Sequence, residues 1–195
     1  GLFERFKGIW DPEALLNPGS IVDPAPIGDD LALAGIPRRT WQTAFDLGIP
    51  GAAHTPDTDV PDGSDLDPFV HATQACIGVG RCRSHSGGVM CPSYRATRDE
   101  KDSTRARARV LQEMLRSAPD IESGWRSEDV RESLELCLSC KACSTDCPTG
   151  VDMATYKAEF FHHHYKGRKR PMSHYSLGWM PAWLSMATAA APMIN

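Results

Sequence analysis

The sequence predicts a mostly α-helical fold, with an extended N-terminal connector in front of the main domain. Apolar side chains recur at helical spacing in several segments. No run of alternating apolar and polar residues indicates β-strands. Residues 23–67 are rich in Pro, Gly and Asp, a composition typical of a connector that lies over a neighbouring surface.

Two short helices are expected on either side of this connector. In residues 1–22, apolar side chains from Phe3 to Trp10 have helical spacing, and the turn signal Asn17-Pro18-Gly19 follows them. Residues 69–75 predict a second short helix that leads into the first cysteine of the chain.

The clearest helical pattern covers residues 104–116. Ser103 is the expected N-cap, and the apolar stripe consists of Val110, Leu111, Met114 and Leu115. Residues 120–126 are interpreted as a loop. Ser127 then caps a further helix, with Glu128 and Asp129 in its first turn and the apolar positions Val130, Leu134 and Leu138.

Two more helical segments are expected towards the C-terminus. Residues 152–166 predict a helix with Tyr156, Phe160 and Phe161 facing inward, and its consecutive histidines 162–164 are interpreted as a frayed polar end. Three consecutive histidines point in three directions on a helix, so they do not share one metal ion. Residues 177–194 are apolar but are interrupted by Pro181 and Pro192.

Composition limits the classes of function. The 195 residues include 21 Lys and Arg against 25 Asp and Glu, a mildly acidic balance that argues against a nucleic-acid-binding protein. Seven cysteines in two short windows argue against a secreted disulfide framework and favour metal-bound thiolates in the cytoplasm. A peripheral position at the inner face of the membrane is an alternative, but no apolar stretch is long enough for a transmembrane segment.

Four of the cysteines form a compact run with the spacing C-x2-C-x2-C-x3-C-P. They are Cys137, Cys140, Cys143 and Cys147. Ferredoxins bind a cubane iron–sulfur cluster with this spacing, and in two-cluster ferredoxins the fourth cysteine binds the other cluster. Structural zinc sites, the alternative, usually combine two separated ligand pairs. The run therefore favours an iron–sulfur cluster and predicts a second set of cysteines.

That second set lies upstream and consists of Cys76, Cys82 and Cys91, the last followed by Pro92. Aligning the two Cys-Pro pairs places Val79 where a middle cysteine would stand. Ligand exchange then predicts that the first three cysteines of the compact run bind a [4Fe–4S] cluster together with Cys91. A second cluster would be bound by Cys76, Cys82 and Cys147.

The type of the second cluster stays open. Three thiolates suit a [3Fe–4S] cluster, and the iron–sulfur subunit of succinate dehydrogenase offers an analogy with a similar C-x5-C spacing. They also suit a [4Fe–4S] cluster whose fourth iron is open or has another ligand, such as His85. In a further alternative only one cluster forms, and these three cysteines bind nothing.

Glycines and arginines accompany the first cysteine set. Glycines 78, 80, 87 and 88 let backbone N–H groups approach the cluster sulfides. Arg105 and Arg109 are assigned to a solvated helix face, whereas other arginines of this region are candidates for offsetting cluster charge or pairing with an anionic partner.

Longer motifs resemble the iron–sulfur segment of FAD- and Fe–S-containing D-2-hydroxy acid dehydrogenases of the D-lactate, glycolate and D-2-hydroxyglutarate type. The motifs are Cys76-Ile-Gly-Val-Gly-Arg-Cys82, Val89-Met-Cys-Pro-Ser-Tyr-Arg-Ala-Thr97, Ser103-Thr-Arg-Ala-Arg-Ala108, Leu136-Cys-Leu-Ser-Cys-Lys-Ala-Cys143 and Val151-Asp-Met-Ala-Thr-Tyr-Lys-Ala-Glu159. Ala106 departs from the family, which usually has Gly at this position. Residues 6–19 resemble the closing motif of the FAD-linked oxidase C-terminal domain.

The resemblance implies a domain organisation. Residues 1–22 would end an FAD-linked oxidase domain, residues 23–67 would be the connector, and residues 68–170 would form a helical, ferredoxin-like iron–sulfur domain. Residues 171–195 would begin a linker to a following domain. On this interpretation the chain, which begins with Gly1, is an internal fragment of a longer protein.

The resemblance also implies a function. The segment would relay electrons from FAD, bound by a domain of the same polypeptide or complex, to a downstream acceptor. No catalytic residue is expected in it. The alternative is a separate iron–sulfur subunit or adaptor of a respiratory-type oxidoreductase complex.

Overall fold

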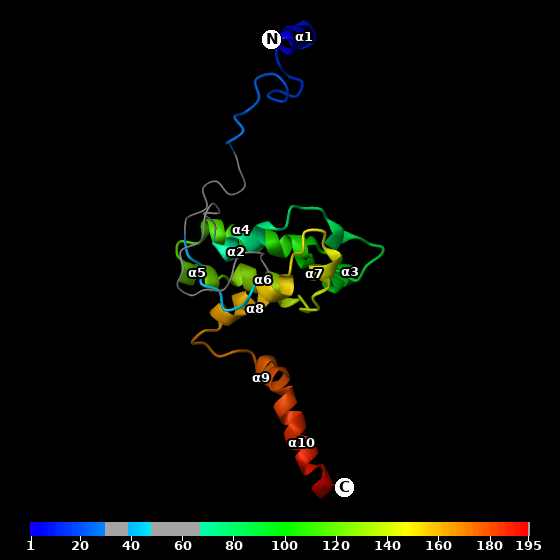
Figure 1. Cartoon of the computed structure of the whole chain (residues 1–195), viewed down its shortest axis with the longest axis vertical. Coiled ribbons are helices and arrows are strands. Elements are labelled where there is room, and N and C mark those ends of the chain that lie inside the picture. Colours follow the sequence, from blue (N-terminus) through cyan, green and yellow to red (C-terminus); the bar gives the residue numbers. More distant parts are fainter. Residues whose placement is uncertain (30–38, 48–66, 195) are drawn as a thin grey trace. The chain divides into compact units, whose positions relative to one another are not determined.

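The computed structural model describes residues 1–29, 39–47 and 67–194 (Figure 1). The chain divides into two units, Gly1–Ile36 and Pro37–Asn195. The described residues form α-helices and two short 3-10 helices and contain no strand, which confirms the mostly α-helical fold. None of the described helices is long and apolar enough to cross a membrane.

The first unit contains helix α1, Leu2–Trp10. The helix stops at Asp11, whose carboxylate accepts the backbone N–H groups of Leu15 and Leu16 and lies 2.8 Å from the Lys7 ammonium group. Its large apolar side chains are exposed, including Trp10 at 74%. The predicted short helix is therefore confirmed.

The second unit contains the other helices. Their bounds are α2 Pro68–Gln74, α3 Pro92–Thr97, α4 Thr104–Ser117, α5 Ile121–Trp125, α6 Glu128–Glu135, α7 Ala142–Asp146, α8 Met153–His164, α9 Met172–Gly178 and α10 Met180–Ile194. The 3-10 helices are η1, Arg81–Arg83, and η2, Glu100–Asp102. Helix α4 packs against α2, α6 and α8 in the middle of this unit (Figure 1).

Side-chain caps begin the predicted helices where the sequence placed them. Ser103 accepts the N–H of Ala106 at 3.1 Å, and Ser127 accepts the N–H of Val130 at 3.3 Å. Each cap satisfies a donor that the first turn of a helix leaves unpaired. The buried stripe of α4 includes Leu111 and Leu115, which are fully buried. The two helices are therefore confirmed.

The predicted loop at residues 120–126 is wrong, because these residues form helix α5. Asp120 caps this helix by accepting the N–H of Ser123 at 2.8 Å. Trp125, at its end, is buried and packs with its ring centroid 5.1 Å from those of both Trp41 and Phe69. Core packing of one tryptophan thus stabilises a helix too short to be stable by propensity alone.

The predicted frayed end of the helix at residues 162–164 is also wrong. His164 is only 2% exposed, and its Nδ1 lies 3.0 Å from the carbonyl oxygen of Trp125. His163 stacks on the Trp125 ring at a centroid distance of 4.4 Å. Its Nε2 lies 2.7 Å from the Glu159 carboxylate. Stacking and hydrogen bonds therefore hold the last turn of α8 in place.

Two smaller expectations also need correction. Val130 and Leu134 are buried as predicted, but Leu138 lies beyond the end of α6 and is 68% exposed. The expected interruption at Pro181 is present, because α9 ends at Gly178 and α10 begins at Met180 with Pro181 as its second residue. The missing N–H of Pro181 costs no hydrogen bond at that position. The expected interruption at Pro192 is absent, because Pro192 lies within α10.

Part of the predicted connector, residues 39–47, belongs to the second unit and packs against its helices. Trp41 is 1% exposed, and its backbone N–H donates to Asp67 at 2.7 Å. The backbone N–H groups of Ala44 and Phe45 donate to the buried carboxylate of Glu159. A Cβ atom at Gly124 would stand 2.5 Å from the Trp41 ring, so only glycine fits there. Residues 30–38 and 48–66 of the predicted connector lie outside the described residues.

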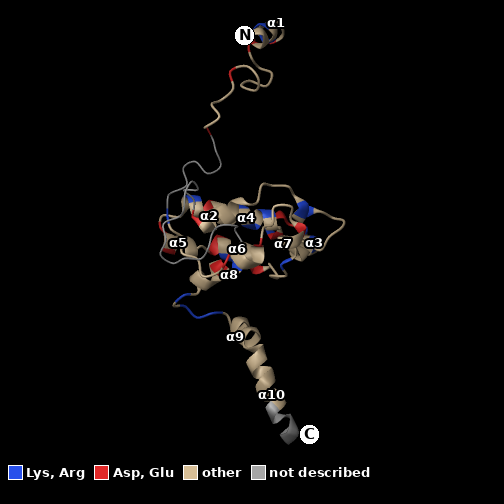
Figure 2. Cartoon of the chain, viewed as in Figure 1, with Lys and Arg blue, Asp and Glu red and all other residues tan. Residues whose placement is uncertain are grey.

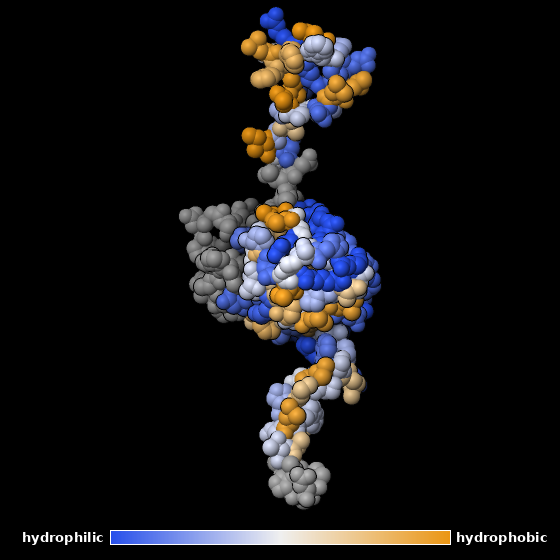
Figure 3. Space-filling model, turned by 90° about the vertical axis from the view of Figure 1, so that its right-hand side faces the viewer, coloured by the Kyte–Doolittle hydropathy of each residue, from blue (hydrophilic) through white to orange (hydrophobic). Residues whose placement is uncertain are grey.

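Charge is unevenly distributed after α8. Figure 2 shows a basic stretch between α8 and α9, which contains Lys166, Arg168, Lys169 and Arg170. Helices α9 and α10 carry no Lys, Arg, Asp or Glu, and Figure 3 shows apolar side chains along them. Met172 and Trp179 are 81% and 61% exposed.

Candidate iron–sulfur site

The two cysteine sets meet near helices α3 and α7, which lie at one end of the second unit (Figure 1). The first set is in the segment between α2 and α4, and the second is between α6 and α8. Four non-glycine residues of these segments, Cys91, Arg98, Ser139 and Lys141, have left-handed backbone with φ of 58°, 59°, 52° and 58°. Strained backbone of this kind gathers at functional sites, where the surrounding structure imposes it.

Four of the predicted ligands line one cavity. Cys91 from the first set faces it together with Cys137, Cys140 and Cys143 of the second. This is the grouping that ligand exchange requires. The structure brings these four thiols together, while their role as ligands stays a prediction.

The donor set of this cavity fits a cubane cluster. Each thiolate of such a cluster binds a different iron, so the sulfurs stand around a space rather than around a point. A structural zinc ion would need four sulfurs roughly 3.8 Å from one another, given tetrahedral Zn–S bonds of about 2.3 Å. Among the described residues, no three His, Cys, Asp or Glu side chains are close enough together to hold one ion.

Three hydrogen-bond donors and one acceptor, the carbonyl oxygen of Asp102 at 3.5 Å, lie around the sulfur of Cys91, which is 6% exposed. The backbone N–H of Thr104 donates to it at 3.0 Å, and the Thr104 hydroxyl lies 3.2 Å away. The guanidinium of Arg107 donates from 3.8 Å. A thiolate is the form of cysteine that binds iron, and a thiolate at this position could accept hydrogen bonds from all three groups.

Cys143 is held differently. Burial raises the pKa of its thiol to about 11, although backbone N–H groups of Met153 and Ala154 act in the opposite direction. Binding of a cluster must therefore remove a proton from a thiol that keeps it at neutral pH. The buried position in turn keeps the bound thiolate away from water.

The start of helix α4 connects the two cysteine sets. The first N–H of the helix, from Thr104, donates to Cys91, and the backbone of the next residue, Arg105, lies beside the Cys82 thiol. Cys82 is 5% exposed, and burial raises the pKa of its thiol, with the neighbouring Cys91 and Cys76 adding to the rise. The positive end of the α4 dipole thus lies beside sulfurs of both cysteine sets and would stabilise negative charge on them.

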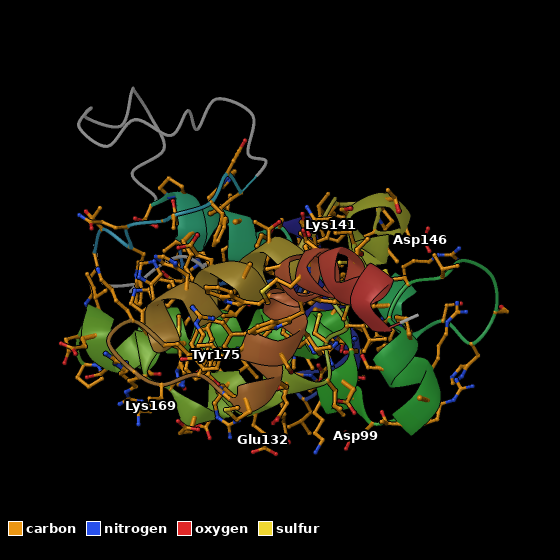
Figure 4. The ribbon with its side chains drawn as sticks, turned by 90° about the horizontal axis from the view of Figure 1, so that it is seen from below. Asp99, Glu132, Lys141, Asp146, Lys169 and Tyr175 are labelled. Atoms are coloured by element: carbon orange, nitrogen blue, oxygen red, sulfur yellow. The ribbon has the colours of Figure 1, made fainter. Side chains whose placement is uncertain are left out.

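Cys147 lies at the end of α7 and beside the first cysteine loop. Burial acts to raise the pKa of its thiol, but hydrogen bonds from Thr149 and nearby backbone N–H groups outweigh burial and lower it. The preceding residue, Asp146, accepts the backbone N–H groups of Val89 and Met90 at 2.7 and 3.0 Å (Figure 4). Among the described residues no hydrogen bond joins Cys147 to Cys76 or Cys82, so that grouping stays a prediction.

Cys76 is half-buried, whereas Val79 and His85 of the same segment are on the surface. Val79, at the position of the absent middle cysteine, is 56% exposed. His85 is exposed, and its Nδ1 is hydrogen-bonded with the Arg98 guanidinium. Its role as a fourth ligand stays untested.

Thr104 and Asp146 were not singled out from the sequence, whereas Arg107 was one of several arginines expected to offset cluster charge. The helical pattern of α4 indicates that Thr104 and Arg107 are buried. Arg107 precedes Leu111 by one helical turn, and Thr104 precedes Arg107 by three residues, so both extend the buried stripe of α4. Asp146 lies between two cysteines, and nothing in the sequence indicates its hydrogen-bond partners.

A second, open cavity adjoins the first, with which it shares Ser139, Lys141 and Ala154. It also has Lys157 and Arg170 in its lining and no carboxylate. The Lys157 ammonium group donates to the carbonyl oxygens of Glu135 and Cys137. Positive charge therefore lies beside the first cavity, on the side of the exposed loop that carries Cys140.

Comparison with protein families decides what kind of domain holds these cysteines. Residues 72–151 match the family described as 4Fe-4S dicluster domain. The chain contains a 4Fe-4S dicluster domain. The matched range includes all seven cysteines.

The dicluster domain is homologous to the iron–sulfur parts of larger oxidoreductases. The chain is 26% identical to a D-2-hydroxyglutarate dehydrogenase of Pseudomonas putida, over 90% of the chain and 19% of that protein. It is 24% identical to the Escherichia coli protein of the same name, over 98% of the chain and 20% of the relative. The chain thus spans about a fifth of the length of these curated relatives.

A shorter match is to the glycolate oxidase iron–sulfur subunit of Escherichia coli. It is 32% identical over 78 residues, which are 40% of the chain and 16% of that subunit. No solved structure matches the chain. These relatives confirm the resemblance to the iron–sulfur segments of such dehydrogenases.

Proposed function

We propose that this chain is the one-electron relay of a flavin-dependent D-2-hydroxy acid dehydrogenase. The observation that carries the proposal is the single cavity lined by four thiols of both cysteine sets, at the start of α4. When bound, the clusters would supply single-electron transfer between a two-electron donor, the flavin, and an acceptor downstream. The residues of this chain would bind the clusters, exclude water from them and tune their charge.

Ligand exchange suggests both proposed ligand sets, and the shared cavity supports the first of them. Cys91, Cys137, Cys140 and Cys143 would bind a [4Fe–4S] cluster. Cys76, Cys82 and Cys147 would bind a second cluster of three or four irons. The shared helix end supports this arrangement, because its first N–H donates to Cys91 and the backbone of the next residue, Arg105, lies beside Cys82.

The partners and the compartment are part of the same proposal. FAD would be bound by an upstream domain, and the positively charged cavity beside the first site suits an acceptor with an anionic surface. All seven cysteines are free thiols in the structure, as a reducing cytoplasm requires, either in solution or at the inner membrane face.

A second candidate is a separate iron–sulfur subunit that docks to a flavoprotein. The similarity to a protein named as an iron–sulfur subunit favours it. The mass of the native polypeptide that contains this segment decides between the two. FAD retained on the same polypeptide supports the first candidate, and FAD on a different polypeptide supports the second.

The experiment that tests the relay uses the full-length native protein, purified without oxygen. Iron and sulfide are counted, EPR spectra are recorded before and after reduction, and D-2-hydroxyglutarate or D-lactate is mixed with the protein in a stopped-flow instrument. We expect iron near four, seven or eight atoms per chain, depending on the clusters present. Flavin should be reduced first and the clusters after it. A protein without iron, or clusters that stay oxidised while flavin is reduced, would overturn the proposal.

A further inference from the structure

Arg107 is a buried arginine whose guanidinium is fixed against the first cavity. It lies on the second turn of α4 and is 2% exposed. Its Nε donates to the carbonyl oxygen of Ser133 at 2.8 Å, and Nη2 donates to the Ser93 hydroxyl at 3.1 Å. Its remaining nitrogen, Nη1, donates to the sulfur of Cys91 at 3.8 Å. The two shorter hydrogen bonds thus orient the third nitrogen towards the cysteine.

The charge of Arg107 is only partly neutralised. The nearest carboxylate is that of Asp102, with Nη2 and Oδ1 3.6 Å apart, and both side chains are almost fully buried. Oδ2 of Asp102 is buried and has no hydrogen-bond partner. The hydrogen bonds to Ser133 and Ser93 link α4 to other segments, but the contact of Nη1 with the Cys91 sulfur adds nothing to that link. Arg107 therefore has a position that structural bridging alone does not explain.

Thr104 supports the same sulfur from the first turn of α4. It is 4% exposed and provides both a backbone N–H and a hydroxyl to Cys91. A cluster-bound thiolate has no proton to donate, so the Thr104 hydroxyl must act as the donor. The sulfur of Cys91 can thus accept hydrogen bonds from three donors: the N–H and hydroxyl of Thr104 and the charged guanidinium of Arg107.

We propose that Arg107 and Thr104 are positioning residues that raise the reduction potential of the first cluster. This inference rests on the proposed function, in which Cys91 is a ligand of that cluster. Reduction adds one electron and hence one negative charge to the cluster. A cation and hydrogen-bond donors at a ligand sulfur stabilise the reduced form more than the oxidised form, most strongly where water is excluded. Asp102 limits the effect of Arg107 because its negative charge opposes it.

The test is an EPR-monitored redox titration of the full-length protein, with iron counted in every variant. We expect Arg107→Gln to shift the midpoint potential of the first cluster to a more negative value. Thr104→Val, which keeps the shape but removes one donor, should shift it in the same direction by less. Asp102→Asn removes the opposing charge and should shift the midpoint to a more positive value.

The matched control is Arg109→Gln, on the same helix but exposed, and hydrogen-bonded only to Gln112 among the described residues. Its midpoint potential should equal that of the wild-type protein. If Arg107→Gln loses its iron, the other two variants still test the inference. The midpoint potential should become more negative in Thr104→Val and more positive in Asp102→Asn. Full iron content with an unchanged midpoint in these two variants overturns the inference and leaves the relay intact. A wild-type protein without iron overturns the proposed function instead.

Discussion

The carboxylate of Asp146 occupies the space next to Gly88 that a side chain would need. A Cβ atom at Gly88 would lie 2.6 Å from Oδ2 of Asp146. The same oxygen accepts the backbone N–H groups of Val89 and Met90, the two residues that precede Cys91. Gly88 also has a backbone φ of 63°, a conformation that residues with a side chain rarely adopt. This contact fixes the first cysteine loop to the residue that precedes Cys147.

Gly88→Ala should therefore weaken cluster binding more than overall folding. The added methyl group displaces Asp146 and breaks the link between the two cysteine loops. We expect reduced iron content with a nearly unchanged helical circular-dichroism spectrum. Asp146→Ala should give the same loss, whereas Asp146→Asn keeps an acceptor oxygen and should retain more iron. Full iron content in Gly88→Ala would contradict this account of the contact.

Ligand exchange makes a pairing prediction that single substitutions test. Cys91→Ser should remove the same cluster as Cys140→Ser, although the two residues are far apart in sequence, because both line the first cavity. Cys147→Ser should remove the second cluster and spare the first, although Cys147 belongs to the compact run. Iron counts and EPR spectra of the three variants check this. Loss of the first cluster in Cys147→Ser, with its retention in Cys91→Ser, would show that each set binds its own cluster.

Local rules account for the parts of the fold that the sequence predicts well. Ser103 and Ser127 begin helices because a hydroxyl before an apolar stripe caps the first turn. The thiol grouping at the first cavity was also predictable, since the ferredoxin spacing implies a ligand from elsewhere. These features depend on neighbours within a few residues or on a known coordination pattern.

Long-range packing accounts for what sequence reasoning missed. Helix α5 depends on Trp125, whose partners Trp41 and Phe69 are remote in sequence. The buried position of Arg107 likewise depends on Ser133 and Cys91, which belong to other segments. Arginine side chains are normally exposed to solvent. Only the position of Arg107 in the buried stripe of α4 indicates that its side chain is buried.

Glu159 fixes residues 39–47 to helix α8, and its removal should destabilise the protein. Its fully buried carboxylate accepts the N–H groups of Ala44 and Phe45 and contacts His163. In Glu159→Ala these donors lose their partner, and we expect the free energy of unfolding to fall by roughly 2–4 kcal/mol. Urea unfolding of the cluster-loaded protein, followed by tryptophan fluorescence, measures this.

Glu159→Gln is the matched control, because it keeps one acceptor oxygen in the same place. It should lose less stability than the alanine variant. Residues 39–47 should become sensitive to protease in Glu159→Ala before the rest of the domain does. Equal stability of the wild-type and alanine proteins would show that the carboxylate does not fix this segment.

His164 should make the stability of the domain fall in mild acid. Burial lowers the pKa of this histidine, although the hydrogen bond to the Trp125 carbonyl and the nearby Glu128 oppose the shift. Arg168 and Arg126 add to the lowering. A histidine in the unfolded chain has a pKa of about 6.5. As the pH falls below this value, the unfolded chain is protonated at His164 while the folded chain is still mostly unprotonated there.

The free energy of unfolding should thus be constant above about pH 7 and should decrease as the pH falls through about 6.5. The decrease should end once the pH lies below the lowered pKa of folded His164. His164→Asn, which can still donate to the Trp125 carbonyl, should remove this part of the pH dependence while costing some stability at pH 7. Urea unfolding of both proteins at several pH values, with iron content checked at each, provides the measurement. An unchanged slope in His164→Asn would assign the acid sensitivity to other groups, with the cysteine sites the first to examine.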